Sequence, residues 1–270
     1  MKKMMLPRLF AILLSLCFTQ LYGMAPKLNW DQAVSNAIQR YGMRMEPHLI
    51  QLFSKAHVSY PPRDIALLTF KKERQMQLWA KDENNSWHYI HTYPLTAFSG
   101  RLGPKLKEHD RQIPEGVYRL TTMNPFSSMH LSMMINYPNS FDRLQASRDG
   151  RVSLGSNIFL HGKNFSVGCL AIGDKAIDQL FLLVHRVGLS HVQLIIAPND
   201  LRHEKPATSS FAQPRWLPEL YAQVAQALKP FTRHKHPKKI SALSPPRLTM
   251  NSLTINAMRH WRENKTVTHA

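Results

Sequence analysis

A succession of short β-type segments between residues 63 and 198 is the feature that most limits how this chain can fold. Residues 65–70 and 87–93 are rich in aliphatic and aromatic side chains, and Asn84-Asn85-Ser86 supplies a hairpin turn before the second run. Similar runs lie at 75–80, 117–121, 129–135, 157–162 and 191–196. This spacing predicts a mainly β domain with flanking helices, in the α+β class.

Helical periodicity lies mostly outside the strand-rich part. Residues 30–56 repeat apolar positions at helical spacing before Pro61-Pro62, and residues 217–228 do so after the last strand. Only one clear helix, opening at Asp174 and running to about residue 187, is expected inside the β domain. The N-terminal helical stretch is interpreted as a cap or linker, with an interaction helix as the alternative.

The N-terminus has the pattern of a secretory signal peptide. Met1-Lys2-Lys3 gives a basic start, and residues 9–18 form an apolar stretch that is short for a membrane span. Cleavage is expected after Gly23, although Leu21 fits that site imperfectly; an uncleaved anchor helix is the alternative. The predicted division is a signal peptide at 1–23, a helical segment at 24–62, a catalytic domain at 63–198 and a C-terminal extension at 199–270.

Signal cleavage would leave Cys169 as the only cysteine of the mature protein, because Cys17 lies within the signal. A lone thiol in an oxidising compartment suggests a chemical role, although a buried, inert cysteine is the ordinary alternative. His161 ends a β-type run eight residues earlier and can serve as a base that activates the thiol. The amides of Gly168 and Cys169 are then candidates for an oxyanion hole.

The chain is strongly basic. Thirty-five Lys and Arg residues against seventeen Asp and Glu give a formal charge of +18, which favours polyanionic partners. Residues 229–270 hold nine basic residues and one acid, Glu263. This tail is interpreted as a solvated extension, or as a binding element for an anionic membrane or wall polymer. Nucleic acid is not an expected partner, because a secreted protein does not meet it.

Several motifs resemble the YkuD-type L,D-transpeptidase catalytic domain, in its YafK-like branch. His161-Gly162 followed by Ser166-Val167-Gly168-Cys169 is similar to the family's active-site signature. The segments 99–105, 110–118, 130–132 and 137–143 resemble the family's entry loop, turn and substrate-side loop. Many relatives have a histidine where Val167 stands, and the YafK-like branch commonly has an apolar residue there.

This resemblance implies a YkuD-like β-sandwich or barrel without metal or cofactor, secreted across the inner membrane to the periplasm of a Gram-negative bacterium. Cys169 matches the family's nucleophile and His161 its proton donor and acceptor, while Ser166 and Gly168 match the loop that shapes the oxyanion site. The expected substrates are peptidoglycan stem peptides. Carboxylates of diaminopimelate are expected to meet a set of polar and basic residues: Arg143, Tyr137, Arg101 and Lys105.

Three alternatives stay open from the sequence. The acyl group that Cys169 accepts can pass to an amine, as in a transpeptidase, or to water, as in an amidase that releases a wall-linked lipoprotein. A non-catalytic module that binds the wall through its charge is a different class of function. For Arg143, a plain surface ion pair with Asp142 is the structural alternative to substrate binding.

Overall fold

The computed structural model describes residues 29–209 and 212–232. The first described element is a helical segment. Helix α2 spans Trp30–Ala37, and Asn29 caps it by accepting a hydrogen bond from the Gln32 N–H. A π-helical turn at Ile38–Gly42 and a 3₁₀ turn at Met43–Met45 lead into α3 at Glu46–Lys55. The helical prediction for residues 30–56 is thus confirmed, with an irregular centre.

Eight strands form one curled mixed sheet in the order β3-β2-β1-β8-β4-β5-β6-β7. Their bounds are β1 Ile65–Phe70, β2 Gln75–Lys81, β3 Trp87–Pro94, β4 Gly116–Asn124, β5 Ser132–Ile135, β6 Phe159–His161, β7 Leu170–Ala171 and β8 Val192–Ala197. The β1–β8 and β6–β7 pairs are parallel, and the other neighbours are antiparallel. The expected fold, mainly β with flanking helices, is confirmed.

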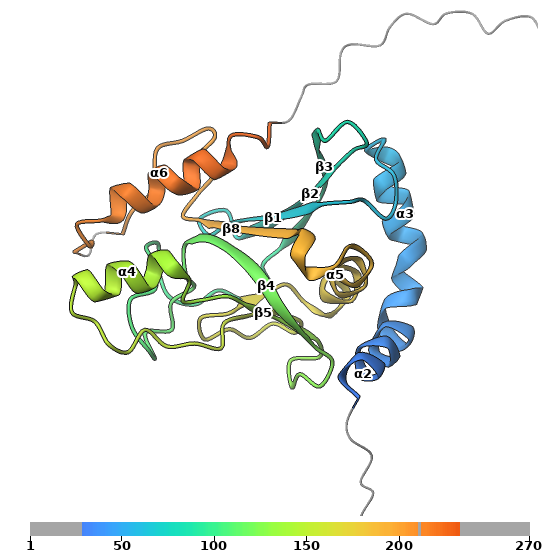
Figure 1. The fold of residues 1–270 in the computed structure, drawn as a ribbon, viewed down its shortest axis with the longest axis horizontal. Helices are drawn as coiled ribbons and strands as arrows, with labels where there is room; N and C mark the ends of the chain where they lie inside the picture. Colours follow the sequence, from blue (N-terminus) through green and yellow to red (C-terminus); the bar gives the residue numbers. More distant parts are fainter. Residues whose placement is uncertain (1–28, 210–211, 233–270) are drawn as a thin grey trace, which may run out of the picture. The chain divides into compact units, whose positions relative to one another are not determined.

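Strand β4 joins the two halves of this sheet. Its residues 116–119 pair with β8 and its residues 120–124 pair with β5, with an irregularity between Leu120 and Thr122 in the second pairing. A bulge of this kind bends a strand and increases its twist. Strand β4 therefore belongs both to the large, regular part of the sheet and to the small part formed by β5, β6 and β7 (Figure 1).

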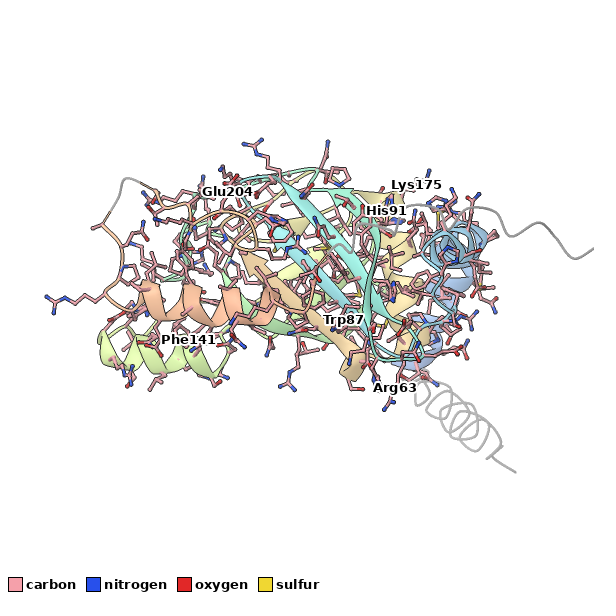
Figure 2. The ribbon with its side chains drawn as sticks, turned by 90° about the horizontal axis from the view of Figure 1, so that it is seen from above. Arg63, Trp87, His91, Phe141, Lys175 and Glu204 are labelled. Carbon is pink, nitrogen blue, oxygen red and sulfur yellow. The ribbon has the colours of Figure 1, made fainter. Side chains whose placement is uncertain are left out.

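Helices cover both faces of the sheet (Figure 1). Helix α5, Asp174–Val187, buries most of its side chains in a core that also takes in α2, α3 and one sheet face. Helix α6, Leu217–Leu228, covers the other face with Leu220, Val224 and Leu228. Trp87 and Phe141 pack at the edge of this second core and are visible from above in Figure 2. Both helices have the bounds predicted from the sequence.

A buried ion pair holds the sheet to the loop before β4. The Lys71 ammonium lies 2.9 Å from the Glu115 carboxylate, and both side chains are fully buried. Lys71 also donates to the carbonyls of Gly103 and Ile113, while Glu115 accepts from Tyr221 of α6 at 2.8 Å. Burial lowers the pKa of Lys71, and these partners compensate for the lost hydration.

The expectation of a single helix within the strand-rich part was wrong. A second helix, α4, spans Ser140–Arg148, where sequence analysis read only a loop. Asn139 and Asp142 form a capping box, and the residues that α4 buries are Asp142, Gln145 and Ala146. A helix whose buried side is mostly polar has no apolar periodicity, so the pattern that revealed α5 was missing here.

The predicted division of the chain at residues 62 and 198 stays a proposal, although α2, α3 and α6 all pack on the sheet. The expected signal peptide, Cys17, and residues 233–270 of the basic tail lie outside the described residues. Among the described helices, none is long and apolar enough to cross a membrane.

Candidate active site

The short parallel strands β6 and β7 bring Cys169 and His161 to one place. Leu160 pairs with Leu170 and His161 with Ala171, so Cys169, directly before β7, lies beside Phe159 at the start of β6, two residues before His161. Both Cys169 and His161 line the same pocket, whose volume is about 470 Å³. The seven residues between them, 162–168, thus fold back as a loop, as the sequence motif predicts.

The imidazole of His161 has a defined hydrogen-bond arrangement. Its Nδ1 lies 2.7 Å from the Gly162 carbonyl oxygen, and the side chain is buried. A carbonyl oxygen can only accept, so Nδ1 carries the proton and Nε2 keeps its lone pair. Burial lowers the pKa of His161, which favours this neutral form at neutral pH. His161 therefore has the protonation state of a general base.

The thiol of Cys169 is protonated rather than ionised. Burial raises the pKa of Cys169; a backbone hydrogen bond at Phe159 and the charge of Lys105 oppose that rise only in part. The Sγ atom lies 3.9 Å from the Asn157 carbonyl oxygen. A reaction at Cys169 thus needs proton removal as part of the step.

The loop before Cys169 is held by serine hydroxyls. Ser166 Oγ donates to the Cys169 carbonyl at 2.7 Å and lies 3.1 Å from Ser99 Oγ, which accepts the Gly168 N–H at 2.7 Å. Gly168 has φ +107°, and a Cβ there would lie 3.2 Å from the Gln112 carbonyl oxygen. Glycine is required at this position by both conformation and space. Because the Gly168 amide is bonded to Ser99, an oxyanion role for it stays a prediction.

Two of the predicted substrate-binding residues are built into the protein interior. Lys105 is buried, pairs with Asp110 at 2.6 Å and donates to the Lys107 carbonyl. The hydroxyl of Tyr137, also buried, donates to the Leu154 carbonyl at 3.2 Å. These contacts anchor loops, and neither side chain lines the pocket that contains Cys169.

The other two, Arg143 and Arg101, are exposed and lie elsewhere. Arg143 on α4 donates its guanidinium to the Pro138 carbonyl, whereas the neighbouring Asp142 carboxylate accepts from the buried Tyr118 hydroxyl. Arg101 lines a separate groove of about 740 Å³ together with Lys107, Arg111 and Arg151. All four residues stay predictions as substrate ligands.

Sequence analysis missed most of the wall of the pocket. The last residue of β4 and the connection that follows it, residues 124–131 and here called the β4–β5 loop, contribute one side through Asn124, Phe126, Ser127, Ser128 and Met129. Phe126, Phe165 and Val167 line the same pocket while 56%, 57% and 51% exposed. Isolated apolar residues in loops give no periodic signal, so only their shared position in space marks them as an apolar rim.

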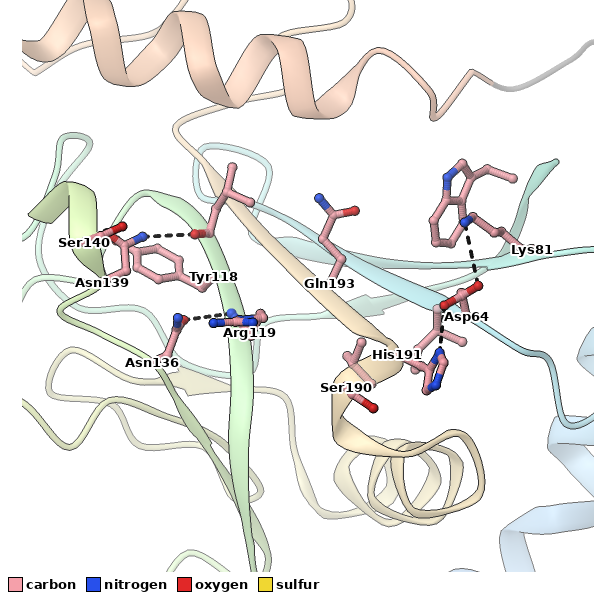
Figure 3. Close-up of a pocket in the computed structure, with 14 residues that line it drawn as sticks. Asp64, Lys81, Tyr118, Arg119, Asn136, Asn139, Ser140, Ser190, His191 and Gln193 are labelled. Carbon is pink, nitrogen blue, oxygen red and sulfur yellow. Dashed lines mark hydrogen bonds and ion pairs between the residues drawn. The ribbon is translucent and has the colours of Figure 1, made fainter. Parts of the chain in front are cut away.

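A second cleft of about 470 Å³ is lined by Trp87, Val117 and Gln193, on the same sheet face as α6 (Figure 3). Its lining also includes Arg119 and the Asp64 carboxylate, which lies 3.0 Å from His191 Nδ1 and 3.6 Å from Lys81 Nζ. None of the residues predicted for catalysis or substrate binding lines it. Within the described residues, no group of three His, Cys, Asp or Glu side chains is arranged to hold a metal ion.

The fold and the paired Cys169 and His161 agree with a match to a known family. Residues 64–193 match the model of the YkuD family, described as the L,D-transpeptidase catalytic domain. The match covers slightly less than half of the chain, and this part of the chain is similar to that family of catalytic domains.

Among individual proteins, YafK of Escherichia coli K12, a presumed L,D-transpeptidase, is 31% identical over 134 residues, which are 48% of this chain and 52% of YafK. The chain spans about half the length of the curated relatives it matches. A point mutant of the helical cell shape determining protein Pgp2 from Campylobacter jejuni gives a TM-score of 0.42 at 17% identity, covering 63% of this chain and 56% of Pgp2. Bd1075 of Bdellovibrio bacteriovorus gives a TM-score of 0.36 at 20% identity, and the match covers 62% of this chain and 55% of Bd1075.

Proposed function

We propose that this protein is a peptidoglycan-modifying acyltransferase with Cys169 as nucleophile and His161 as general base. The observation that carries the proposal is the shared pocket of the two side chains, in which the Nδ1 bond to Gly162 leaves Nε2 of His161 as the proton acceptor. The family match of residues 64–193 supports the same chemistry. Stem peptides that contain diaminopimelate are the proposed substrates.

The protonation states define the order of events. Because Cys169 is a neutral thiol and His161 a neutral imidazole, Nε2 takes the thiol proton as Sγ attacks the substrate carbonyl. The tetrahedral intermediate then collapses: the C–N bond breaks, the leaving amine takes the proton from His161, and a thioester remains on Cys169. An acceptor amine or water then attacks the thioester while Nε2 of His161 takes a proton from it; the C–S bond breaks, and His161 gives that proton to the sulfur, which restores the thiol.

Transpeptidation and hydrolysis share every step until the acceptor enters. The exposed apolar rim of Phe126, Phe165 and Val167 offers contacts to methyl and methylene groups of a bound peptide. These contacts do not distinguish an acceptor amine from water. We therefore propose the acyl-enzyme step as the common function, with release of a wall-linked lipoprotein as the hydrolytic form of it. Secretion to the periplasm and binding of an anionic wall polymer or membrane through the basic tail, residues 229–270, belong to the same proposal.

The test uses the mature full chain with purified sacculi, with and without bound lipoprotein, and identifies products by mass spectrometry. Wild type should release or exchange stem-peptide products, and a trapped adduct should map to Cys169. Cys169→Ala should lose all turnover while its thermal unfolding stays close to wild type, since one small side chain replaces another. Turnover above a few per cent of wild type in this variant would remove Cys169 as the nucleophile.

A further inference from the structure

The β4–β5 loop, residues 124–131, begins at the last residue of β4, continues as irregular chain and forms one wall of the Cys169 pocket. It connects β4 to β5, and β5 pairs with β6, the strand that ends in His161. The position of this loop therefore sets the width of the pocket opposite Cys169. An irregular loop needs specific contacts to keep one conformation, because each ordered residue costs conformational entropy.

His130 supplies the first of these contacts. Its backbone has a φ of +74°, a left-handed conformation that is uncommon for a residue with a side chain. Its Nε2 lies 2.7 Å from Asp178 Oδ1, and Asp178 is buried on α5. The other carboxylate oxygen of Asp178 accepts a hydrogen bond from Arg44 at 3.0 Å. The Tyr41 ring packs edge-on against the His130 ring, with 4.5 Å between the ring centroids.

Two further contacts hold the start and the tip of the loop. Trp30 donates its indole N–H to the Met123 carbonyl at 3.0 Å, and its ring packs against Phe126 at 5.8 Å. Lys163, which lies between His161 and Cys169 in the sequence, donates its ammonium to the Ser128 carbonyl at 2.6 Å. The loop is thus fixed from the N-terminal helical segment on one side and from the Cys169 loop on the other.

Several of these contacts come from the N-terminal helical segment. Trp30, Tyr41 and Arg44 lie outside the 64–193 segment that matches the family, yet each reaches the β4–β5 loop or the carboxylate that holds it. Asp178 receives hydrogen bonds from both His130 and Arg44, so one buried carboxylate connects the pocket wall to the N-terminal segment. A buried carboxylate without such partners would be strongly destabilising.

We propose that His130 and Asp178 are positioning residues that hold the β4–β5 loop as a preformed wall for the acyl-donor peptide, with residues 30–44 as its outer support. This proposal rests on the proposed function of the Cys169 pocket. A preformed wall improves binding because the free protein has already ordered the loop. Loss of the His130–Asp178 bond should weaken peptide binding without changing the reactivity of Cys169.

The experiment compares His130→Ala, His130→Asn and Arg186→Gln with wild type. Asparagine tolerates the left-handed conformation and keeps an N–H donor for Asp178. Arg186→Gln is the matched control: Arg186 of α5 pairs with Glu46 of α3 at 3.0 Å and so joins α5 to the N-terminal segment without touching the loop. A soluble diaminopimelate-containing muropeptide is titrated into each variant in the Cys169→Ala background, and KM and kcat are measured with Cys169 present.

His130→Ala should raise the dissociation constant and KM of the muropeptide about tenfold, with kcat within about twofold of wild type. Amide hydrogen exchange of residues 124–131 should become faster in the same variant. Iodoacetamide should alkylate Cys169 at the wild-type rate. His130→Asn should recover part of the affinity, and Arg186→Gln should leave affinity and loop exchange unchanged even where it lowers the unfolding temperature.

Three results would overturn the proposal: unchanged affinity and loop exchange in His130→Ala, an equal loss of affinity in Arg186→Gln, or no muropeptide binding by any Cys169→Ala protein. A different result tests the proposed function. If wild type binds the muropeptide but forms no adduct at Cys169, the acyltransferase reaction is wrong. The proposal for the β4–β5 loop is then decided by the muropeptide dissociation constants and the amide hydrogen exchange alone.

Discussion

The two halves of the sheet differ in how their structure is held. In the large half, β1 pairs with β2 and β8 along its whole length, and its six side chains are buried. In the small half, β5, β6 and β7 have only four, three and two residues, and loops make up much of the surroundings. Apolar burial stabilises the first half; in the second the short strands are also buried, but the loops around them are fixed by individual hydrogen bonds. The candidate site lies in the second.

This difference has a physical reason. A site needs polar groups, a cavity and exposed contact surface, and none of these adds to a close-packed core. The regular half supplies the free energy that lets the small half keep residues such as Gly168 and His130 in left-handed conformations. Mutations should therefore separate: changes in the small half should affect activity, and changes in the large half should affect stability.

The largest expected effect is on the chemistry of the small half. His161→Ala should lower the rate of acyl transfer by about two to four orders of magnitude, because no base remains to take the Cys169 proton. Stopped-flow or single-turnover measurements of adduct formation check this, with the exposed His191→Ala as control. At alkaline pH, above the raised pKa of Cys169, iodoacetamide should alkylate variant and wild type alike. A residual rate near wild type would remove His161 from the mechanism.

The same division explains what the sequence could predict. Residues 65–70, 174–187 and 217–228 bury apolar side chains in a regular pattern, and the structure has elements with those bounds. His161 and Cys169 are close in sequence, so a motif can show that they share a loop. Pairs such as His130 with Asp178 or Lys71 with Glu115 are 48 and 44 residues apart, and single polar residues give no sign of a distant partner.

Helix α4 and strand β7 show the same limit on local patterns. Helix α4 is set by the capping box of Asn139 and Asp142, and β7 consists of only Leu170 and Ala171 beside β6. Two residues are too few for any periodicity, and a strand of that length exists only because its partner is already in place. Elements of this kind depend on tertiary contacts, which the sequence does not display locally.

The next effect concerns the large half. Lys71→Met should lower the free energy of unfolding by about 3–5 kcal/mol, since it leaves the buried Glu115 carboxylate without its cation. Urea unfolding of the variant and wild type gives this difference. Lys72→Met is the matched control, because its ion pair with Glu204 is about half exposed on both sides and should contribute no measurable stability. Equal midpoints for Lys71→Met and wild type would contradict the proposed division.

Asp142 lies beside β4, where the halves meet, and should give a pH dependence. Burial raises the pKa of Asp142 from 3.8 to about 6, so the folded protein binds this proton more tightly than the unfolded chain. Its contribution to stability should grow as the pH falls from 7 through 6 toward 4, and should approach about 3 kcal/mol. Asp142→Asn should lack this rise. The free energy of unfolding is measured for both proteins between pH 3 and 7. The difference between the two pH dependences removes the contributions of the other carboxylates.

The smallest expected effect tests whether α6 acts on the large half alone. Tyr221 donates to Glu115 at 2.8 Å, and Glu115 also accepts from the Gly103 N–H in the loop that leads back to Ser99 and Gly168. Tyr221→Phe keeps the ring packing and should lower the free energy of unfolding by about 1.5 kcal/mol, the contribution of one hydrogen bond to a charged group. The decrease should be smaller in a Glu115→Gln background, because the acceptor is then neutral. If Tyr221→Phe instead leaves stability unchanged and alters the alkylation rate of Cys169, the hydrogen bonds through Glu115 reach the site, and the two halves are not independent.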